Sequence, residues 1–491
     1  MIETHISKLV FTEDHVYKIK RAVTFGFVDL STVAARQESC RAEVALNSRL
    51  APDVYEGVGS FRHPDGHEEP VVVMKRLPAE RRLSTLVLHG DPAVGIHLQQ
   101  VAATIAGFHA RAGRSPEIES DCSPQAVGAL WAENASELSQ VSGPILDPAE
   151  VDRLDRLARR YLMGRQALLA SRVTAGRAVD GHGDLLADDI FCLRDGPRIL
   201  DCLEFSARLR HCDTLSDVAS LAADLERIGR PDLAERFLTA YAGYAGDAWP
   251  ESLAHYYTAY RAAVRAKVAC LRASLERDLT VRSWAEVEAR RLLAISLGHL
   301  DEATVRLVLI GGLPGTGKST LGRRLEAATG WKLIRSDVVR KQLAGIDPDE
   351  DARAAFGHGI YSPQATALVY AEMLSRAEML MRSGHSVILD ASWLRQCWRD
   401  EALSAAERCF ADLIGLRCEA GREVAASRLL RRSFTQRDAS DATVEIADAM
   451  AEAVEPWEEA ATIDTSGRLQ DSMLAVLSLL GLLYKEDRDT W

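Results

Sequence analysis

The chain has 491 residues, of which 47% are hydrophobic and 26% are charged. This length exceeds the roughly 250–300 residues at which one hydrophobic core stops growing, so a single compact domain is excluded and two or three domains are expected. The formal net charge of −12 argues against a surface that follows a nucleic-acid backbone or an anionic membrane throughout.

The cysteines indicate a reducing compartment. All nine are scattered and form no C-x-x-C pair, so neither a disulfide framework nor a zinc site is predicted. Cys192, Cys202 and Cys212 are evenly spaced beside His211, but we expect them to be buried small hydrophobic residues and not metal ligands. No secretory signal is expected at the start, and the longest apolar stretch, residues 473–484, is too short to span a membrane. We expect a cytoplasmic protein with no membrane or nucleic-acid partner.

The first 78 residues or so predict a small lobe of mixed strand and helix. Short β-type runs occupy residues 7–11, 16–20 and 71–75, and residues 32–50 between them have a helical pattern. Lys18 and Lys20 of the second run are two residues apart, so they share one face of the predicted strand.

Residues 79–290 predict a mainly helical lobe. Apolar positions recur three and four apart in residues 95–109, 151–169 and 252–275. One β-like hairpin, within residues 181–205, interrupts this pattern.

Carboxylates bracket this hairpin. His182-Gly183-Asp184 and Asp189 precede it, and Asp201 follows it. Phosphoryl transfer to a hydroxyl needs this combination, because one carboxylate orients the nucleophile while others hold a metal. A turn rich in Asp and Gly without catalytic purpose is the alternative.

The two lysines of the small lobe have a candidate partner. Glu43, in the predicted helix, could pair with one of them, as a lysine that binds nucleotide phosphates requires. Two solvent-facing lysines are the alternative for this strand considered alone.

These features resemble the aminoglycoside-phosphotransferase-like branch of the protein-kinase fold. The matching pieces are Tyr17-Lys18-Ile19-Lys20, Glu43 in its helix, His182-Gly183-Asp184-Leu185, Asp201-x-x-Glu204-Phe205 and Asp217-Val-Ala-x-Leu. The resemblance implies that Asp184 is the catalytic base, that Asp201 and Asp189 bind metal, and that Lys18 contacts phosphate, with Lys20 as the alternate.

Two positions depart from the family pattern H-G-D-L-H-x-x-N. Leu186 stands where the pattern has His, and Asp189 stands where it has Asn. An aspartate can still bind Mg²⁺, so the departures weaken the inference of activity without excluding it.

After a charged helical connector at residues 283–302, apolar strands alternate with helices, as a parallel sheet requires. The expected strands are residues 305–310, 332–335, 386–389, 411–416 and 462–464.

The strongest motif follows the first of these strands. The sequence from Gly312 to Ser319 matches G-x-x-x-x-G-K-[ST] between an apolar strand and a helix. Glycines let backbone amides surround phosphate oxygens, Lys318 neutralises the β- and γ-phosphates, and Ser319 can ligate Mg²⁺. A glycine-rich turn before a helix is the alternative. The predicted nucleotide-binding residues are Gly312, Gly315, Thr316, Gly317, Lys318, Ser319 and Thr320.

Further candidates lie downstream. Asp390 ends an apolar strand, where such folds place a group near the metal or the attacking hydroxyl. Asp337 could accept a hydroxyl proton, with Arg340 one turn further on to hold an anionic group. Either aspartate could instead cap the following helix. Arg428 and Arg432 could close over the transferring phosphates, and a solvated charged face is their alternative.

The second module resembles the small P-loop kinases of the adenylate-kinase-like group, including the gluconate-kinase, zeta-toxin and chloramphenicol-phosphotransferase relatives. The matching pieces are residues 312–320, 335–340, 387–392, 428–437 and 440–443. The resemblance implies Mg·ATP-dependent phosphoryl transfer under a mobile arginine lid. The order of the modules resembles bifunctional proteins that join an aminoglycoside-phosphotransferase-like kinase to an ATP-binding domain.

The sequence thus predicts a multidomain α/β protein, with a bilobal kinase-like module at residues 1–290 and a P-loop kinase domain with a parallel sheet at residues 303–491. Its predicted function is phosphorylation of a small hydroxylated metabolite or antibiotic-like molecule by ATP and Mg²⁺, with the stronger catalytic signal in the C-terminal module. In one alternative, both sites act in sequence on one metabolite. In the other, the N-terminal module is a regulator that binds nucleotide or another ligand without chemistry of its own.

Overall fold

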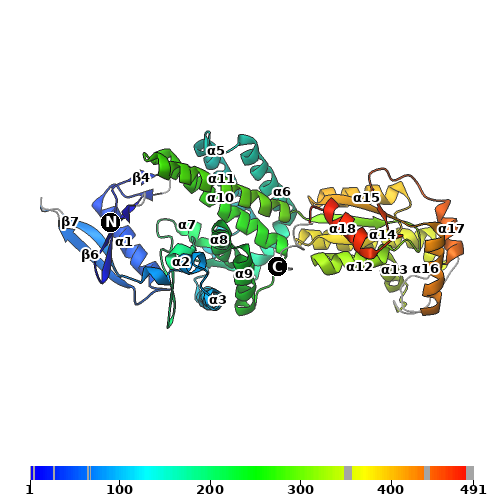
Figure 1. Ribbon diagram of the computed structural model, residues 1–491, viewed down its shortest axis with the longest axis horizontal. Helices are drawn as coiled ribbons and strands as arrows, with labels where there is room; N and C mark the ends of the chain where they lie inside the picture. The colour runs from blue at the N-terminus through cyan, green and yellow to red at the C-terminus, as the bar shows by residue number, and fades with distance from the viewer. Residues whose placement is uncertain are drawn as a thin grey trace. The chain divides into compact units, whose positions relative to one another are not determined.

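The computed structural model divides the chain into two compact units (Figure 1). The residues it describes are 2–3, 6–25, 28–62, 66, 68–347, 357–435 and 443–482. The first unit comprises Met1–Arg159, Leu169–Trp249 and Leu253–Ala303. The second unit comprises Arg160–Leu168, Pro250–Ser252 and Thr304–Trp491.

The first unit begins with a small lobe in which an antiparallel sheet carries one helix. The strand order is β1-β2-β3-β7-β6, and all neighbouring strands run antiparallel. The elements are β1 (Ile2–Glu3), β2 (Ser7–Phe11), β3 (His15–Lys20), the hairpin β4 (Thr24–Phe25) and β5 (Val28–Asp29), α1 (Val33–Asn47), β6 (Tyr55–Arg62) and β7 (Glu68–Lys75).

Two details of this lobe show how the sequence produces it. Helix α1 begins after Thr32, whose hydroxyl accepts a hydrogen bond from the backbone N–H of Ala35. Strand β6 is not predicted from the sequence, because Gly57 and Gly59 interrupt its alternation and its register with β7 shifts between Tyr55 and Gly57.

The rest of the first unit is the predicted helical lobe with short strands inserted. Its elements are η1 (Ala79–Arg81), α2 (Leu83–Leu88), α3 (Val94–Arg111), α4 (Pro116–Asp121), α5 (Pro124–Ser142), α6 (Pro148–Thr174), β8 (Ala178–Asp180), η2 (Ala187–Asp189), β9 (Ile190–Leu193), β10 (Gly196–Ile199), α7 (Ala207–Arg210), β11 (His211–Asp213), α8 (Thr214–Arg227), α9 (Pro231–Ala245), α10 (Glu251–Leu275) and α11 (Leu279–Glu302). Strands β9 and β10 form the predicted hairpin. Helix α8 is buried from Thr214 to Leu225, so the acidic side chains of Asp217 and Asp224 lie inside the lobe.

The second unit contains the predicted parallel sheet. Its strand order is β13-β14-β12-β15-β16, and all four pairings are parallel. Its elements are β12 (Arg306–Gly311), α12 (Lys318–Thr329), β13 (Lys332–Arg335), α13 (Ser336–Leu343), η3 (Gly359–Tyr361), α14 (Pro363–Arg382), β14 (Val387–Asp390), α15 (Gln396–Arg408), β15 (Asp412–Glu419), α16 (Arg422–Thr435), α17 (Val444–Ala451), β16 (Ala461–Asp464) and α18 (Leu469–Leu479).

Both faces of this sheet are covered. Along β12, Leu307 and Leu309 belong to one hydrophobic cluster, whereas Val308 and Ile310 belong to another. Successive side chains of a strand point to opposite faces, so the unbroken apolar run of β12 packs into one hydrophobic core on each face of the sheet. This burial explains why the strand next to the glycine-rich motif is visible in the sequence.

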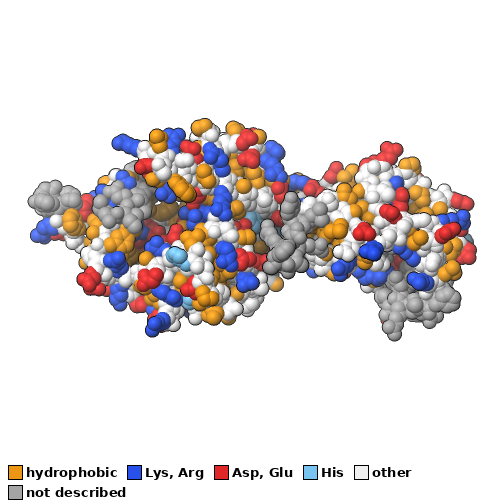
Figure 2. Space-filling model, viewed as in Figure 1, with side chains coloured by type: hydrophobic (Ala, Val, Ile, Leu, Met, Phe, Trp, Pro, Cys, Tyr) orange, Lys and Arg blue, Asp and Glu red, His pale blue; other side chains and the backbone are white. Residues whose placement is uncertain are grey.

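The remaining composition-based expectations concern cysteines, charge and membranes. Cys192, Cys202 and Cys212 are buried, as predicted. Acidic and basic side chains are interspersed on the face drawn in Figure 2. Within the described residues, no helix is both long enough and apolar enough to cross a membrane.

A close approach between the sheet and Trp457 gives a test of this packing. A Cβ added to Gly415 in β15 would lie 2.7 Å from Cζ2 of the buried Trp457. We expect Gly415→Ala to destabilise the second unit by about 1–3 kcal/mol through overpacking. Calorimetry of the full chain should show a lower unfolding midpoint. Gly421→Ala, which meets nothing within 4 Å, is the control, and an equal shift in both variants would contradict the packing.

Candidate functional site

The glycine-rich motif of the second unit forms a tight loop between β12 and α12. Gly312, Gly315 and Gly317 have φ values of 130°, 81° and 88°, which only glycine adopts easily. A Cβ at Gly312 would lie 2.4 Å from the carbonyl oxygen of Cys418, and one at Gly315 would lie 2.6 Å from that of Ala425. The loop therefore requires these glycines, and it leads directly into the N-terminus of α12, where backbone amides favour an anion.

Side chains hold this loop in place. Thr316 and Lys318 each donate a 2.8 Å hydrogen bond to the carbonyl oxygen of Leu313. The hydroxyl of Thr465, which follows β16, lies 2.5 Å from the Thr316 carbonyl oxygen and 2.8 Å from that of Glu419, so its single proton is shared between the two acceptors. Thr465 lies 149 positions from Thr316, and no local motif in the sequence reveals its role.

Asp390 lies at the same edge of the sheet as the loop. It ends β14, in register with Ile310 of β12 and with Arg335 of β13. The Asp390 side chain is buried, and its Oδ2 lies 3.4 Å from Nε of Arg335. Asp337 stands in the first turn of α13, which follows the neighbouring strand.

The capping alternative fails for both aspartates. The N-cap residues of α13 and α15 are Arg335 and Arg395, so neither Asp337 nor Asp390 caps the helix that follows it. Asp390 instead pairs with Arg335 at the edge of the sheet that carries the loop.

The arginines of the second unit have different environments. Arg428 on α16 donates a 2.6 Å hydrogen bond to the Thr465 carbonyl oxygen and lies 3.4 Å from that of Gly315. Arg340 is buried and donates to the carbonyl oxygen of Ile360 at 2.7 Å. Arg428 is therefore brought to the phosphate loop, whereas Arg340 holds the chain ahead of α14. Arg432 lies on α16, and its side chain, like residues 436–442 of the expected lid, falls outside the described residues.

In the first unit, the two lysines of β3 are buried, so the solvent-facing alternative is wrong. Lys18 Nζ donates a 2.5 Å hydrogen bond to Asp201 Oδ1 and lies 2.8 Å from Glu43 Oε1. Burial opposes the charge of Lys18, but Asp201 and Glu43 outweigh it and raise its pKa well above the usual value. Lys20 lies 2.6 Å from Glu43 Oε2 and donates a hydrogen bond to Glu204.

Asp201 is the solvent-exposed carboxylate of these ion pairs. Its side chain is 51% exposed, and its φ of 63° is unusual for a residue other than glycine. Although burial acts in the opposite direction, the Lys18 ammonium lowers the pKa of Asp201. Asp201 is thus an ionised, half-exposed carboxylate beside the buried ion pairs of Lys18, Lys20, Glu43 and Glu204.

Asp189 completes an acidic group with Asp201 and Asp184. Burial, followed by the charges of Asp201 and Asp184, raises the pKa of Asp189 well above its usual value. A cation would relieve this repulsion, so the donor set fits Mg²⁺. In the described part of the chain, however, no three His, Cys, Asp or Glu side chains are grouped as a metal cluster.

Asp184 lies in a loop that Asp217 of α8 holds by hydrogen bonds. The backbone N–H groups of His182 and Gly183 donate to the two oxygens of Asp217 at 2.7 and 2.8 Å, and His109 Nε2 lies 2.9 Å from it. Despite burial, the hydrogen bond and charge of His109 lower the pKa of Asp217. Asp217 belongs to the family-like piece Asp217-Val-Ala-x-Leu, but only the fold shows that it holds the loop of Asp184.

The Asp184 carboxylate itself faces α10. Arg265 Nη1 lies 3.5 Å from Asp184 Oδ2, and both side chains are partly exposed. Leu186, two residues further along, precedes η2 and brings no polar group to this end of the site.

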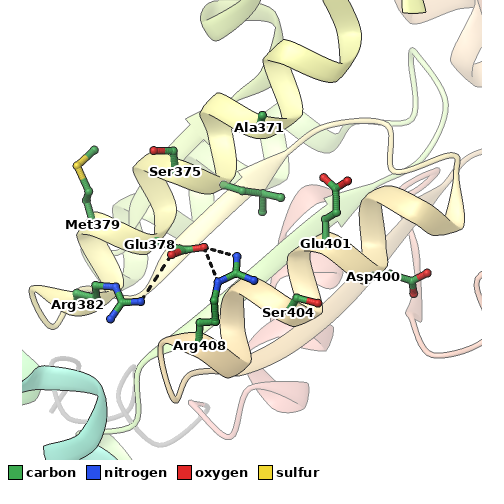
Figure 3. A pocket seen from close by; sticks show the side chains of 10 residues that line it. Ala371, Ser375, Glu378, Met379, Arg382, Asp400, Glu401, Ser404 and Arg408 are labelled. Carbon is green, nitrogen blue, oxygen red and sulfur yellow. Dashed lines mark hydrogen bonds and ion pairs between the residues drawn. The ribbon is translucent and has the colours of Figure 1, made fainter. Parts of the chain in front are cut away.

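A groove of about 630 Å³ between α14 and α15 is separate from these sites (Figure 3). Glu378 of α14 joins the two walls by pairing with Arg408 of α15 at 2.5 Å, and it also lies 3.7 Å from Arg382 on its own helix. The lining residues precede β14 and β15, so the groove lies toward the N-terminal edge of the sheet, opposite the phosphate loop. It is not the nucleotide site.

Comparison with known proteins agrees with the two-module arrangement. Residues 28–255 match the family model "Phosphotransferase enzyme family", and residues 307–457 match the model "AAA domain". "Uncharacterized protein Rv2004c" of Mycobacterium tuberculosis and "Uncharacterized protein Mb2027c" of Mycobacterium bovis are each 40% identical over 472 residues, 96% of this chain and 93% of theirs. The chain belongs to the family of these mycobacterial proteins. The predicted pairing of an aminoglycoside-phosphotransferase-like module with a P-loop module is confirmed, as is the predicted fold class.

Solved structures resemble one module each. A gluconokinase from Sinorhizobium meliloti 1021 is 18% identical, with a TM-score of 0.27, over 38% of this chain and 98% of its own. A choline/ethanolamine kinase family protein from Mesorhizobium loti is 15% identical, with a TM-score of 0.38, over 61% and 90%. The GDP complex of aminoglycoside 2'-phosphotransferase-IIIa is 15% identical, with a TM-score of 0.37, over 60% and 91%.

The buried bonds of Asp217 give a direct test of how the Asp184 loop is held. In Asp217→Asn, one carboxylate oxygen becomes an NH₂ group that faces a backbone N–H. We expect a loss of about 3 kcal/mol in unfolding free energy at pH 7, where the native carboxylate is ionised. Denaturant titration measures this loss. Asp232→Asn, which breaks an exposed pair with Arg230, should cost less than about 1 kcal/mol, and equal losses would refute the role of Asp217.

Proposed function

We propose that this protein is an ATP-dependent phosphotransferase that acts on a small hydroxylated molecule, with the P-loop domain as its better-supported catalyst. The observation that carries the proposal is the glycine loop of residues 312–317, which opens onto Lys318, Ser319 and the buried Asp390 at one edge of the sheet. The family matches support kinase-type chemistry, and the acceptor's class is part of the proposal.

In the proposed mechanism, the amides of residues 312–319 and Lys318 bind the nucleotide phosphates, and Ser319 and Asp390 would hold Mg²⁺. Bound Mg²⁺ would supply positive charge against the phosphates. Asp337 accepts the proton of the acceptor hydroxyl as its oxygen bonds to the γ-phosphorus, and ADP leaves. Arg428 supports the loop, and Arg432 neutralises charge on the transferring group.

In the first unit we assign Lys18, and not Lys20, to the phosphates. Lys18 lies between Glu43 and the partly exposed Asp201, whereas Lys20 has no exposed side-chain surface and is bound to Glu204. Asp201 and Asp189 would hold Mg²⁺, and Asp184 would accept the acceptor's proton.

A second candidate function gives this unit a regulatory role. Leu186 provides no polar group beside Asp184, and Arg265 pairs with that carboxylate. The unit would then bind nucleotide and influence the P-loop kinase without transferring phosphate itself.

The assignment of the P-loop domain is tested by Lys318→Ala. We expect at least about a hundredfold loss of acceptor-dependent ADP production from this domain, because phosphate charge in the transition state loses its counter-ion. Lys332→Ala, an exposed lysine of the same unit, should leave turnover unchanged. The measurement is ADP release over sugars, amino sugars, aminoglycosides and nucleosides, and undiminished release in Lys318→Ala would refute the assignment.

The first unit is tested with the P-loop site silenced. In the Lys318→Ala background we expect residual Mg²⁺-dependent ATP turnover that responds to an added acceptor and disappears in Asp184→Ala, because the proton acceptor is removed. Asp195→Ala, in the exposed turn between β9 and β10, is the control. Nucleotide binding without any acceptor-stimulated turnover would favour the regulatory function.

A further inference from the structure

A second buried lysine–glutamate pair lies beside the one that holds Lys18. Lys20 Nζ donates a hydrogen bond to Glu204 Oε1 and lies 2.6 Å from Glu43 Oε2. The side chains of Lys20 and Glu43 have no exposed surface, and that of Glu204 is 5% exposed. One carboxylate of α1 therefore meets both lysines of β3, since its other oxygen faces Lys18.

The two lysines tie one segment to β3 at two points. Lys18 reaches Asp201, and Lys20 reaches Glu204 three residues later. The points differ in exposure, because Asp201 is half exposed whereas Glu204 is buried. A ligand from solvent can compete for Lys18, but opening the Lys20–Glu204 pair would leave an uncompensated charge inside the protein.

The segment needs such an anchor. Asp201 has φ in the left-handed region, which costs free energy for a side chain with a Cβ and persists only when neighbouring contacts enforce it. The Asp201 N–H lies 3.4 Å from the hydroxyl of Tyr55, and the Cys202 N–H donates a 2.8 Å hydrogen bond to Asn47 Oδ1. The Leu203 N–H donates to the His182 carbonyl oxygen at 3.1 Å, and Arg210 donates to the Leu203 carbonyl oxygen at 3.0 Å, so these bonds hold the middle of the segment while Lys18 and Lys20 hold its two ends. Glu204 adds charge-assisted contacts to Lys20 and a 3.3 Å hydrogen bond from Ser39.

We propose that Lys20 and Glu204 are positioning residues that hold Asp201 in its metal-binding place and leave Lys18 free to exchange Asp201 for nucleotide phosphate. This inference rests on the proposed function of the first unit. It assigns different tasks to two lysines that the sequence alone leaves interchangeable. Lys18 acts on the ligand, and Lys20 acts only through the segment that carries Asp201.

The structure offers a matched control for a merely structural ion pair. Arg36 Nη2 of α1 lies 2.6 Å from Glu69 Oε1 of β7, and both side chains are largely buried. This pair also joins α1 to the sheet, but it does not touch the segment at residues 201–204. Glu69→Gln should therefore reproduce any general loosening of the lobe.

The experiment compares Glu204→Gln with Glu69→Gln in the full chain, in the Lys318→Ala background that weakens the other nucleotide site. The first measurement is backbone hydrogen exchange without metal or nucleotide. We expect exchange at Cys202 and Leu203 to accelerate about tenfold or more in Glu204→Gln alone. The second is Mn²⁺ binding, followed by electron paramagnetic resonance, with a non-hydrolysable ATP analogue. We expect affinity about tenfold weaker in Glu204→Gln and nearly unchanged in Glu69→Gln.

Equal behaviour of the two variants in hydrogen exchange would overturn the proposal. If Glu204→Gln does not fold, Glu204→Asp, which keeps the charge but shortens its reach, is compared in the same way and should give a smaller change of the same sign. If the parent chain binds no Mn²⁺ with the analogue, the proposed nucleotide site of this unit fails. The exchange comparison still decides the positioning role, because it uses no ligand.

Discussion

The buried charge of Glu43 determines how the small lobe and the segment after β10 fit together. A carboxylate without exposed surface is tolerated only when cations and hydrogen-bond donors compensate it. Here the compensation comes from Lys18 and Lys20 of one strand, at 2.8 and 2.6 Å. Each ammonium group also donates a hydrogen bond to a second carboxylate: Lys18 donates to Asp201, and Lys20 donates to Glu204. The cluster thereby links α1, β3 and the candidate metal segment through ion pairs and charge-assisted hydrogen bonds.

The candidate phosphate site of the second unit is built in a different way. Its loop depends on backbone conformation, with three glycines at positive φ and no room for a Cβ at Gly312 or Gly315. Backbone amides and one helix N-terminus supply the positive potential there, and Lys318 is the added point charge. One chain therefore contains a candidate phosphate site made chiefly of buried side-chain charges and another made chiefly of backbone geometry.

This difference explains how much the sequence predicts. A backbone-based site is contiguous, so the motif at residues 312–319 and its flanking strand can be identified directly, and the strand Lys332–Arg335 has the predicted limits. A site built from side-chain charges depends on distant contacts. Lys18 and Asp201 are 183 positions apart, and His182 and Asp217 are 35 apart. The resemblance to a known family named most of these residues, but it could not choose between Lys18 and Lys20.

The sequence does not reveal strand β6 or the residues that support the two loops, because their place depends on contacts made only in the folded chain. Strand β6 lacks clear alternation because glycines and a register shift interrupt it. Thr465 supports its loop through a hydrogen bond to a backbone carbonyl and belongs to no motif, whereas Asp217 belongs to a family-like motif that does not show which backbone groups it holds. Such supporting residues become visible only when the fold places them beneath the site.

The same reasoning applies to the least regular part of the first site. Leu186 removes a polar side chain from the loop of Asp184, and Arg265 brings a guanidinium to that carboxylate from α10. A cation near the base can balance charge on a transferring phosphoryl group, or it can keep the carboxylate occupied. The two candidate functions of this unit give Arg265 these two different roles. The choice between the two candidate functions therefore involves α10, which follows the hairpin by some fifty residues, as well as Leu186 of the loop motif.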